Sequence, residues 1–295
     1  MLTEADVRRR LGVAALIGGL ESAFRERYLT VQIPARTHIA IEGGVLLTMP
    51  CYDPASHVLG MKLVAVRNGV HATYLLMDPA NGRPKLTIEA NWLTDLRTAC
   101  TSALATKYLS RSDARTLGIF GTGRQARAHL AVVPLVRNFE RVLICGRDPK
   151  RVHLFIAEFG TGLDVQPATA EQCAGQSDVI CTCTASATPL FEGTALRPGT
   201  HLNLVGAFQP SAREVDSITI QRARVFVESY EAILAEAGDV LMAIKEGAFK
   251  PEDLIADLHE LVSLKKPGRE SEREITVFKS VGCALEDLVA AELLL

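Results

Sequence analysis

Short apolar runs alternate with polar turns over the first hundred residues of this chain. Strand-like runs cover residues 31–39, 45–49, 58–66, 73–77 and 86–88. Asn81-Gly82, between the last two runs, is a strong hairpin-turn signal. Helical patterns over 14–27 and 93–109 flank the runs, and the first is amphipathic through Leu16, Leu20 and Phe24. The pattern predicts an α+β domain with a mainly antiparallel sheet.

From residue 116 onward, predicted strands alternate with helix-compatible segments. The strands cover 117–120, 141–145, 163–165, 178–183, 201–205 and 224–228, and several are apolar on both faces. This is typical of a doubly wound parallel sheet, so the fold class is α/β. The tail over 274–295 is a helix candidate that we expect to return to the first domain. The predicted division is therefore 1–115 plus 274–295 for the first domain and 116–273 for the second.

Composition limits the class of protein. At 295 residues, two domains are the default expectation. The net charge is −2, with 32 basic and 34 acidic residues interspersed, which argues against nucleic-acid or anionic-membrane partners. No apolar run has the length of a membrane span, and the N-terminus carries acids where a secretion signal would carry cations. Seven cysteines without a Cys-x-x-Cys pair, and histidines without metal-ligand spacing, favour a reduced, cytoplasmic protein without a metal site.

The strongest chemical signal is a glycine-rich turn between a strand and a helix. The strand ending at Phe120 runs into Gly121-Thr122-Gly123-Arg124-Gln125-Ala126. Gly121 permits a tight turn, Gly123 lets the backbone approach a pyrophosphate, and Ala126 allows close helix–strand packing. The motif alone is weak, but the strand, the helix and the later α/β units lie where it requires them. The second domain is therefore predicted to be a Rossmann dinucleotide-binding domain.

The end of the next strand bears on the choice of coenzyme. An NAD site usually places an acid there, whereas this chain has Gly146 followed by Arg147. The missing acid leaves room for a 2′-phosphate, and a guanidinium can pair with it. Asp148 is the competing ribose acceptor, although it fits better as the N-cap of a helix that begins at Pro149. The pattern favours NADPH, with NADH possible.

Two further strand ends are candidates for coenzyme contacts. Thr184 follows the fourth strand, where a Rossmann loop reaches the ribose or the pyrophosphate. A hydroxyl that satisfies its own loop backbone is an equally good reading. Val205 and Gly206, at the end of the fifth strand, are assigned to the coenzyme site as well.

Three cations lie in apolar or closely packed surroundings of the first domain. Lys62 has apolar neighbours on both faces of its strand, Arg97 lies on a helix of small residues, and Arg36 follows Pro34 in an extended run. Each could be exposed or in a structural ion pair, and Asp95 is a ready local partner for Arg97. A buried lone cation is costly, so three that converge would indicate an anionic ligand, most naturally a carboxylate.

Together, these segments resemble the ornithine cyclodeaminase/mu-crystallin family over nearly the whole chain. The resemblance is carried by residues 2–7, 61–64, 93–99, 121–126, 206–210 and 213–216, and by the tail 278–287. It implies a Rossmann domain paired with an α+β substrate and dimerisation domain, and a homodimer. It also implies that Arg36, Lys62 and Arg97 hold the substrate carboxylate near the nicotinamide.

One position departs from the cyclodeaminase pattern. Those enzymes carry a proton-handling aspartate shortly after the glycine that ends the fifth strand, and the matching residue here is Phe208. A phenyl ring cannot exchange a proton, but it can line an apolar site for a ring-shaped substrate, or simply pack at the strand end.

The expected function is NADPH-dependent reduction of cyclic imino acids, Δ1-pyrroline-2-carboxylate or Δ1-piperideine-2-carboxylate, to proline or pipecolate. Arg36 and Arg97 would clamp the carboxylate, and Lys62 would assist and could donate a proton. The alternatives are an ornithine cyclodeaminase, an alanine-type amino acid dehydrogenase, and a crystallin-like protein that binds NADPH and a small ligand with little turnover.

Overall fold

The structure, a computed structural model, describes residues 1–159 and 162–295 of the chain. These residues form two compact units, Met1–Thr101 with Gly282–Leu295, and Ser102–Val281. Helix α3 (Asn91–Leu109) begins in the first unit and ends in the second. These units change inside this helix and after residue 281. The domain division expected from the sequence, with boundaries near residues 115 and 273, stays a prediction.

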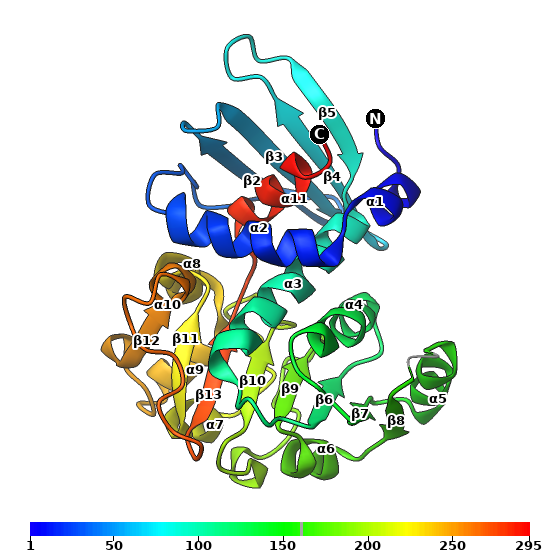
Figure 1. The fold of residues 1–295 in the computed structure, drawn as a ribbon, viewed down its shortest axis with the longest axis vertical. Helices are drawn as coiled ribbons and strands as arrows, with labels where there is room; N and C mark the ends of the chain where they lie inside the picture. The colour runs from blue at the N-terminus through cyan, green and yellow to red at the C-terminus, as the bar shows by residue number, and fades with distance from the viewer. Residues whose placement is uncertain (160–161) are drawn as a thin grey trace. The chain divides into compact units, whose positions relative to one another are not determined.

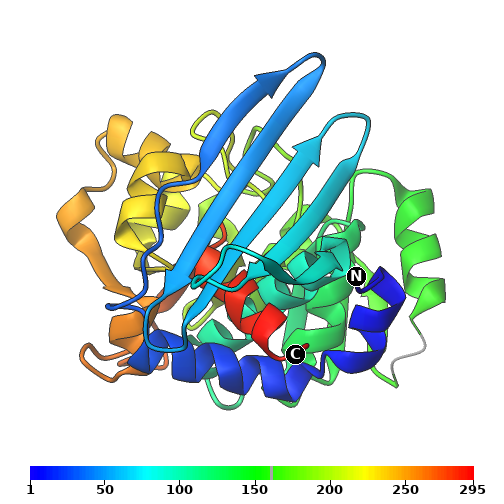
Figure 2. The same ribbon diagram turned by 90° about the horizontal axis from the view of Figure 1, so that it is seen from above.

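The first unit is a five-stranded antiparallel sheet with helices on one face. Its strands pair in chain order, namely β1 (Thr37–Ile41), β2 (Gly44–Asp53), β3 (Val58–Val66), β4 (Val70–Met77) and β5 (Pro84–Glu89). The inward face of β2 is apolar at Leu47, Met49 and Cys51. Helix α11 (Ala284–Glu292) contacts β2, β3 and β4 and packs on α2 (Val13–Glu26) (Figure 2). A short helix, α1 (Glu4–Arg10), opens the chain. The predicted α+β domain is confirmed.

The second unit is an eight-stranded parallel sheet whose strands run in the order β12-β11-β13-β10-β9-β6-β7-β8 (Figure 1). The strands are β6 (Thr116–Phe120), β7 (Arg141–Cys145), β8 (Asp164–Pro167), β9 (Val179–Thr182), β10 (His201–Leu204), β11 (Ala223–Val227), β12 (Leu254–Asp257) and β13 (Ile275–Lys279). The six neighbouring strands from β8 to β13, numbered among themselves in chain order, have the Rossmann order 3-2-1-4-5-6. The strands β11 and β12, which precede β13 in the chain, lie beyond it at the edge of the sheet. The predicted fold class is confirmed.

Helices connect these parallel strands. They are α4 (Arg124–Val132), α5 (Pro149–Glu158), α6 (Ala170–Gln176), α7 (Ser217–Arg222), α8 (Tyr230–Glu236), α9 (Gly238–Lys245) and α10 (Leu258–Val262), with short 3-10 turns at Val133–Leu135, Gly193–Ala195 and Pro251–Asp253. Parallel neighbours require such crossovers, because the chain must return to the same end of the sheet before each new strand.

Two sequence predictions were wrong in part. The strand expected over 31–39 begins only at Thr37, because Pro34 lacks the N–H that a central ladder position needs. The tail expected to be helical over 274–295 starts with β13, which is buried at all five positions between β10 and β11. Only α11, after it, is helical and belongs to the first unit.

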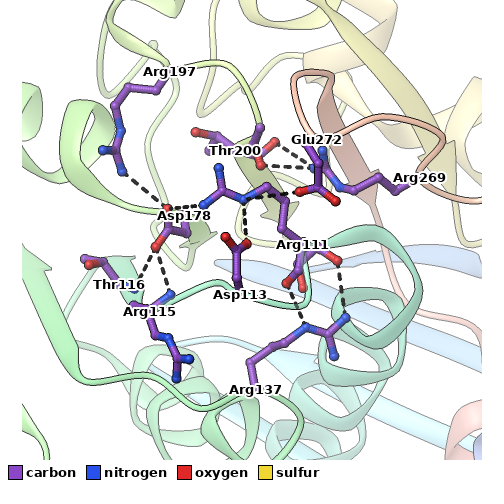
Figure 3. A network of polar contacts seen from close by, with 12 residues as sticks. Arg111, Asp113, Arg115, Thr116, Arg137, Asp178, Arg197, Thr200, Arg269 and Glu272 are labelled. Carbon is purple, nitrogen blue, oxygen red and sulfur yellow. Dashed lines mark hydrogen bonds and ion pairs between the residues drawn. The ribbon is translucent and has the colours of Figure 1, made fainter.

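The amino edge of the parallel sheet holds a network of arginines (Figure 3). Asp178 accepts hydrogen bonds from the backbone N–H groups of Arg115 and Thr116, both at 2.9 Å. Arg137 and Arg269 donate to carbonyl groups at the end of α3, including those of Lys107 and Leu109 at 2.8 and 2.7 Å. Because the last carbonyls of a helix have no partner within it, these cations stabilise the C-terminus of α3. We therefore assign these arginines to the stability of the fold.

Candidate active site

A cavity of about 810 Å³ lies at the opposite edge of the second unit, where the carboxyl ends of β6, β7 and β9 meet. The chain runs from β6 to β7 and β8 on one side, and continues with β9 and β10 on the other. Ligands of open α/β sheets bind at such a reversal of strand order. The cavity therefore has the location of a dinucleotide site.

The glycine turn lines this cavity and has the geometry that the motif requires. Gly121 has φ +115°, and a Cβ there would lie 2.6 Å from the carbonyl oxygen of Cys183. Gly123 is the N-cap of α4, no side chain caps that helix, and a Cβ on Gly123 would meet no protein atom within 4 Å. The first amides of α4 are thus open to a phosphate, and the helix dipole favours a negative charge there.

The end of β7 excludes an acidic side chain at the position where an NAD site usually has one. A Cβ on Gly146 would lie 2.8 Å from Cγ2 of Val152, a buried residue of α5. Arg147 lines the cavity, and it has no ion-pair partner in the described part of the chain. Asp148 caps α5 by accepting from the Lys150 N–H at 2.9 Å, as predicted. Arg151, on the first turn of α5, lines the cavity too, and its Nε lies 3.7 Å from Oδ2 of Asp148.

Thr184 lines the cavity and is held by a buried carboxylate. Both its backbone N–H and its hydroxyl donate to Oε1 of Glu214 at 2.7 Å. The alternative raised for Thr184, a hydroxyl that satisfies its own loop backbone, also holds, because this hydroxyl accepts from the backbone N–H of Ser186 at 3.2 Å.

Six of the ten predicted coenzyme residues line the cavity, namely Gly121, Thr122, Gly123, Gly146, Arg147 and Thr184. The other four, Arg124, Gln125, Val205 and Gly206, are not among the lining residues in the part of the chain that the structure describes. Arg124 and Gln125 open α4, and Gly206 contacts the Thr184 loop from behind. These assignments stay predictions.

In the first unit, the three predicted cations converge on one segment. Lys62 Nζ lies 2.7 Å from Oδ2 of Asp287, and Arg97 Nε lies 3.0 Å from Oδ1 of the same carboxylate. Arg97 also pairs with Glu286. Arg36 donates to the carbonyl of Gly282 at 2.8 Å, and the Arg97 guanidinium lies so close to Gly282 that a Cβ there would approach it to 2.9 Å. We call Arg36, Lys62 and Arg97 the cation cluster.

Burial and charge tune this cluster. Lys62 and Arg97 are 1% and 4% exposed. Burial, together with the nearby charge of Arg97, lowers the pKa of Lys62 to about 8, while Asp287 opposes the shift. The pKa of Lys62 is therefore closer to neutrality than that of an exposed lysine.

The sequence reading assigned no role to the two carboxylates that hold the cluster. Glu286 and Asp287 are fully buried on α11, among apolar neighbours such as Leu285 and Leu288. Two adjacent acids among the apolar residues of this helix were the available signal, because buried acids need cationic partners.

The structure adds less about the other candidates that the sequence raised. Phe208 is 40% exposed in the loop that follows β10 of the second unit. Within residues 1–159 and 162–295, no group of three His, Cys, Asp or Glu side chains is placed to hold a metal ion. Among these same residues, no helix is long and apolar enough to cross a membrane.

The second unit is thus a Rossmann domain with a dinucleotide cavity, and the first is an α+β unit with a cation cluster in which Lys62 and Arg97 are buried. The sequence model of the ornithine cyclodeaminase/mu-crystallin family matches residues 1–295, so the chain belongs to this family. It is 37% identical to a Delta(1)-pyrroline-2-carboxylate reductase of Bacillus cereus over 290 residues, which covers 93% of this chain and 88% of the relative. The predicted family is confirmed.

Two solved structures have the same fold. One is Thermococcus litoralis Delta(1)-pyrroline-2-carboxylate reductase in complex with NADH and L-proline, with a TM-score of 0.96, 36% identity, and coverage of 99% of this chain and 95% of that one. The other is an archaeal alanine dehydrogenase dimer with bound NAD, with a TM-score of 0.93, 28% identity, and coverage of 99% and 93%.

The two glycines of the turn make separable predictions. Gly123→Ala should raise the Kd for NAD(P)H about tenfold or more and leave thermal unfolding unchanged, because its methyl group meets only the space that a pyrophosphate approaches. Gly121→Ala should also lower stability by about 1–3 kcal/mol, through strain at positive φ. Fluorescence titration and thermal unfolding measure both effects. Wild-type coenzyme affinity in Gly123→Ala would contradict the assignment of this cavity.

Proposed function

We propose that this protein is an NADPH-dependent reductase of cyclic 2-imino acids, with Δ1-pyrroline-2-carboxylate and Δ1-piperideine-2-carboxylate as substrates and proline and pipecolate as products. The observation that carries the proposal is the cation cluster, in which the buried Lys62 and Arg97 share the carboxylate of Asp287, in a chain that is 36–37% identical to reductases of this class. When bound, NADPH supplies a hydride to the carbon of the protonated C=N bond and leaves as NADP⁺.

The protein's own residues bind and orient the substrate. Lys62 and the arginines offer N–H donors to a carboxylate, and Asp287 fixes the Lys62 ammonium and the Arg97 guanidinium relative to each other. Cations held in this way fix the substrate carboxylate, and therefore also the position of the imine carbon that is bonded to it. A protonated ring nitrogen supplies its own acid, so the reaction proceeds without a carboxyl group at Phe208, and Lys62 is the proton donor for a ring that arrives neutral.

A panel of substrates tests the proposal. NADPH oxidation with Δ1-pyrroline-2-carboxylate, and the appearance of proline, supports it. NAD-dependent release of ammonia from ornithine would indicate a cyclodeaminase, and activity confined to pyruvate and ammonia an alanine-type dehydrogenase. Tight NADPH binding without oxidation of any imino acid would indicate a binding protein. Each of the last three outcomes overturns the reductase.

Arg147 and Arg151 are proposed to select NADPH over NADH. Arg147→Ala should raise the Kd for NADPH about 10–100-fold, the loss expected for a hydrogen-bonded charge pair, and leave the Kd for NADH unchanged. The matched control is Lys150→Ala, an exposed neighbouring cation that does not line the cavity. An unchanged NADPH affinity in Arg147→Ala would contradict the 2′-phosphate assignment.

The Lys62 ammonium predicts an alkaline limit to substrate binding. At a pH below its pKa of about 8, Lys62 is a cation that attracts a carboxylate. At a higher pH it is a neutral amine that does not attract a carboxylate. The Kd of pyrrole-2-carboxylate, a planar analogue whose own charge is constant above neutral pH, should therefore rise as the pH increases past about 8. Lys62→Met should bind more weakly and show no such dependence. A wild-type Kd that stays constant up to about pH 10 would exclude this role.

The uncovered face of the five-stranded sheet is proposed to be the interface of a homodimer. On the face opposite the helices, Pro50, Met61 and Leu75 form one apolar row across β2, β3 and β4. Ile39 of β1, 49% exposed, is directly opposite Leu46 in the register. An apolar sheet face of this kind is typical of a protein–protein contact, and a dimeric relative supports the proposal.

Met61→Asp should convert the dimer to a monomer, because it buries a charge in the interface. The control is Val70→Asp, which replaces an exposed apolar residue that does not belong to this row. Light scattering coupled to size-exclusion chromatography measures both masses. Equal masses for the two variants would reject this face as the interface.

A further inference from the structure

The carboxylate of Glu214 is a buried hydrogen-bond acceptor that joins two loops of the second unit. Oε1 accepts from the backbone N–H and the hydroxyl of Thr184, and Oε2 accepts from the Thr182 hydroxyl, all at 2.7 Å. Oε2 also accepts from the backbone N–H groups of Gly206 and Ala207 at 2.7 and 3.2 Å. One side chain therefore connects the loop after β9 with the loop after β10.

These loops approach too closely for any residue but glycine at position 206. A Cβ on Gly206 would lie 2.0 Å from the carbonyl oxygen of Thr184 and 2.5 Å from Oε1 of Glu214. The glycine that the sequence associates with coenzyme binding is thus needed to bring the two loops onto a single carboxylate. Its contribution to the cavity passes through Thr184, which lines it.

A second pair of buried charges, Asp239 and Lys279, holds the backbone next to Glu214. Oδ1 of Asp239 accepts from the backbone N–H groups of Glu214 and Val215 at 2.7 and 3.1 Å. Oδ2 of Asp239 lies 2.9 Å from Nζ of Lys279, the last residue of β13, and Lys279 donates to the carbonyl of Ala207 at 2.5 Å. Glu214, Asp239 and Lys279 are buried completely or nearly so. The network therefore binds both the N–H and the C=O group of Ala207.

Stability alone does not explain so many buried charges. Burial raises the pKa of Glu214, the charge of Lys279 opposes the shift, and five donors converge on the carboxylate with no acceptor for a proton. The ionised form is the one that these donors fit. Because apolar replacements of buried ion pairs are often neutral or stabilising, we attribute this network to the geometry of the two loops.

We propose that Glu214 is a positioning residue that sets the loops of Thr184 and Ala207 against the nicotinamide half of the coenzyme. This inference rests on the proposed function. The adenosine half of a dinucleotide lies over the strand that ends at Gly146 and Arg147, so the nicotinamide half extends past β6 toward β9 and β10. Glu214 acts there through Thr184 and Ala207 and has no contact with the coenzyme itself.

Glu214→Gln tests this role, because one carboxylate oxygen becomes an NH2 group that faces at least one backbone N–H donor. The matched control is Asp216→Asn, which alters a carboxylate two residues away that accepts from the Gly193 and Thr219 N–H groups and lies outside the network. Three readouts apply to both variants: the Kd of 2′,5′-ADP for the adenosine half, the fluorescence anisotropy of bound NADPH for its nicotinamide ring, and the single-turnover rate of imine reduction.

In Glu214→Gln, we expect an unchanged Kd for 2′,5′-ADP, a lower anisotropy of bound NADPH, and a rate of imine reduction that falls about 10–100-fold. Asp216→Asn should match the wild type within about twofold in all three. A Glu214→Gln rate no lower than that of Asp216→Asn overturns the proposal, and so does a 2′,5′-ADP affinity that falls in parallel with the rate.

A second variant covers the case in which Glu214→Gln does not fold. Thr182→Val removes one donor to Oε2 at a buried position outside the cavity and should lower the anisotropy and the rate by a smaller factor. Wild-type values of both in Thr182→Val would overturn the proposal. If the wild type reduces no imino acid, the proposed function fails, while the anisotropy of bound NADPH still decides whether Glu214 positions the nicotinamide.

Discussion

Burying a lysine and an arginine side by side costs several kcal/mol unless a carboxylate is buried with them, and Asp287 meets this requirement for Lys62 and Arg97 at once. The cation cluster of the first unit depends on this carboxylate. Since Asp287 lies on α11, the last helix is as much a part of the cation cluster as the strand that carries Lys62. The lowered pKa of Lys62 has the same origin, because burial and the charge of Arg97 outweigh the attraction of Asp287.

The same physical rule organises the second unit, with the opposite sign at its centre. There a buried anion, Glu214, gathers N–H and O–H donors from the ends of two strands, and Lys279 compensates part of the negative charge. At the amino edge of the same sheet, arginines such as Arg137 and Arg269 bind the carbonyls at the end of α3. At the carboxyl ends of the strands, the buried Glu214 thus holds Thr184 in the lining of the cavity. At the amino ends, the arginines bind the free carbonyls of α3.

Much of the fold, and the glycine turn that lines the cavity of the second unit, could be predicted from sequence. The glycine turn at Gly121 and Gly123, the missing acid at Gly146 and the N-cap at Asp148 are local features, so a few neighbouring residues suffice to recognise them. The partners of the cations could not be found in this way. Arg97 and Asp287 are 190 residues apart, and the nearest acid in the chain, Asp95, was the obvious candidate. The role of Gly206 was equally hidden, because it depends on how close the Thr184 loop comes.

The amino-acid sequence by itself determined the kinds of elements, the class of each sheet and the glycine turn, because hydrophobic periodicity and backbone freedom act over a few residues. Only the tertiary structure decided that β13 inserts between β10 and β11, and that the last helix supplies the carboxylates of the cation cluster. Strand order and ion pairing are settled when distant segments close on one another and every buried charge must find a partner. A local sequence pattern does not show which distant segments will meet.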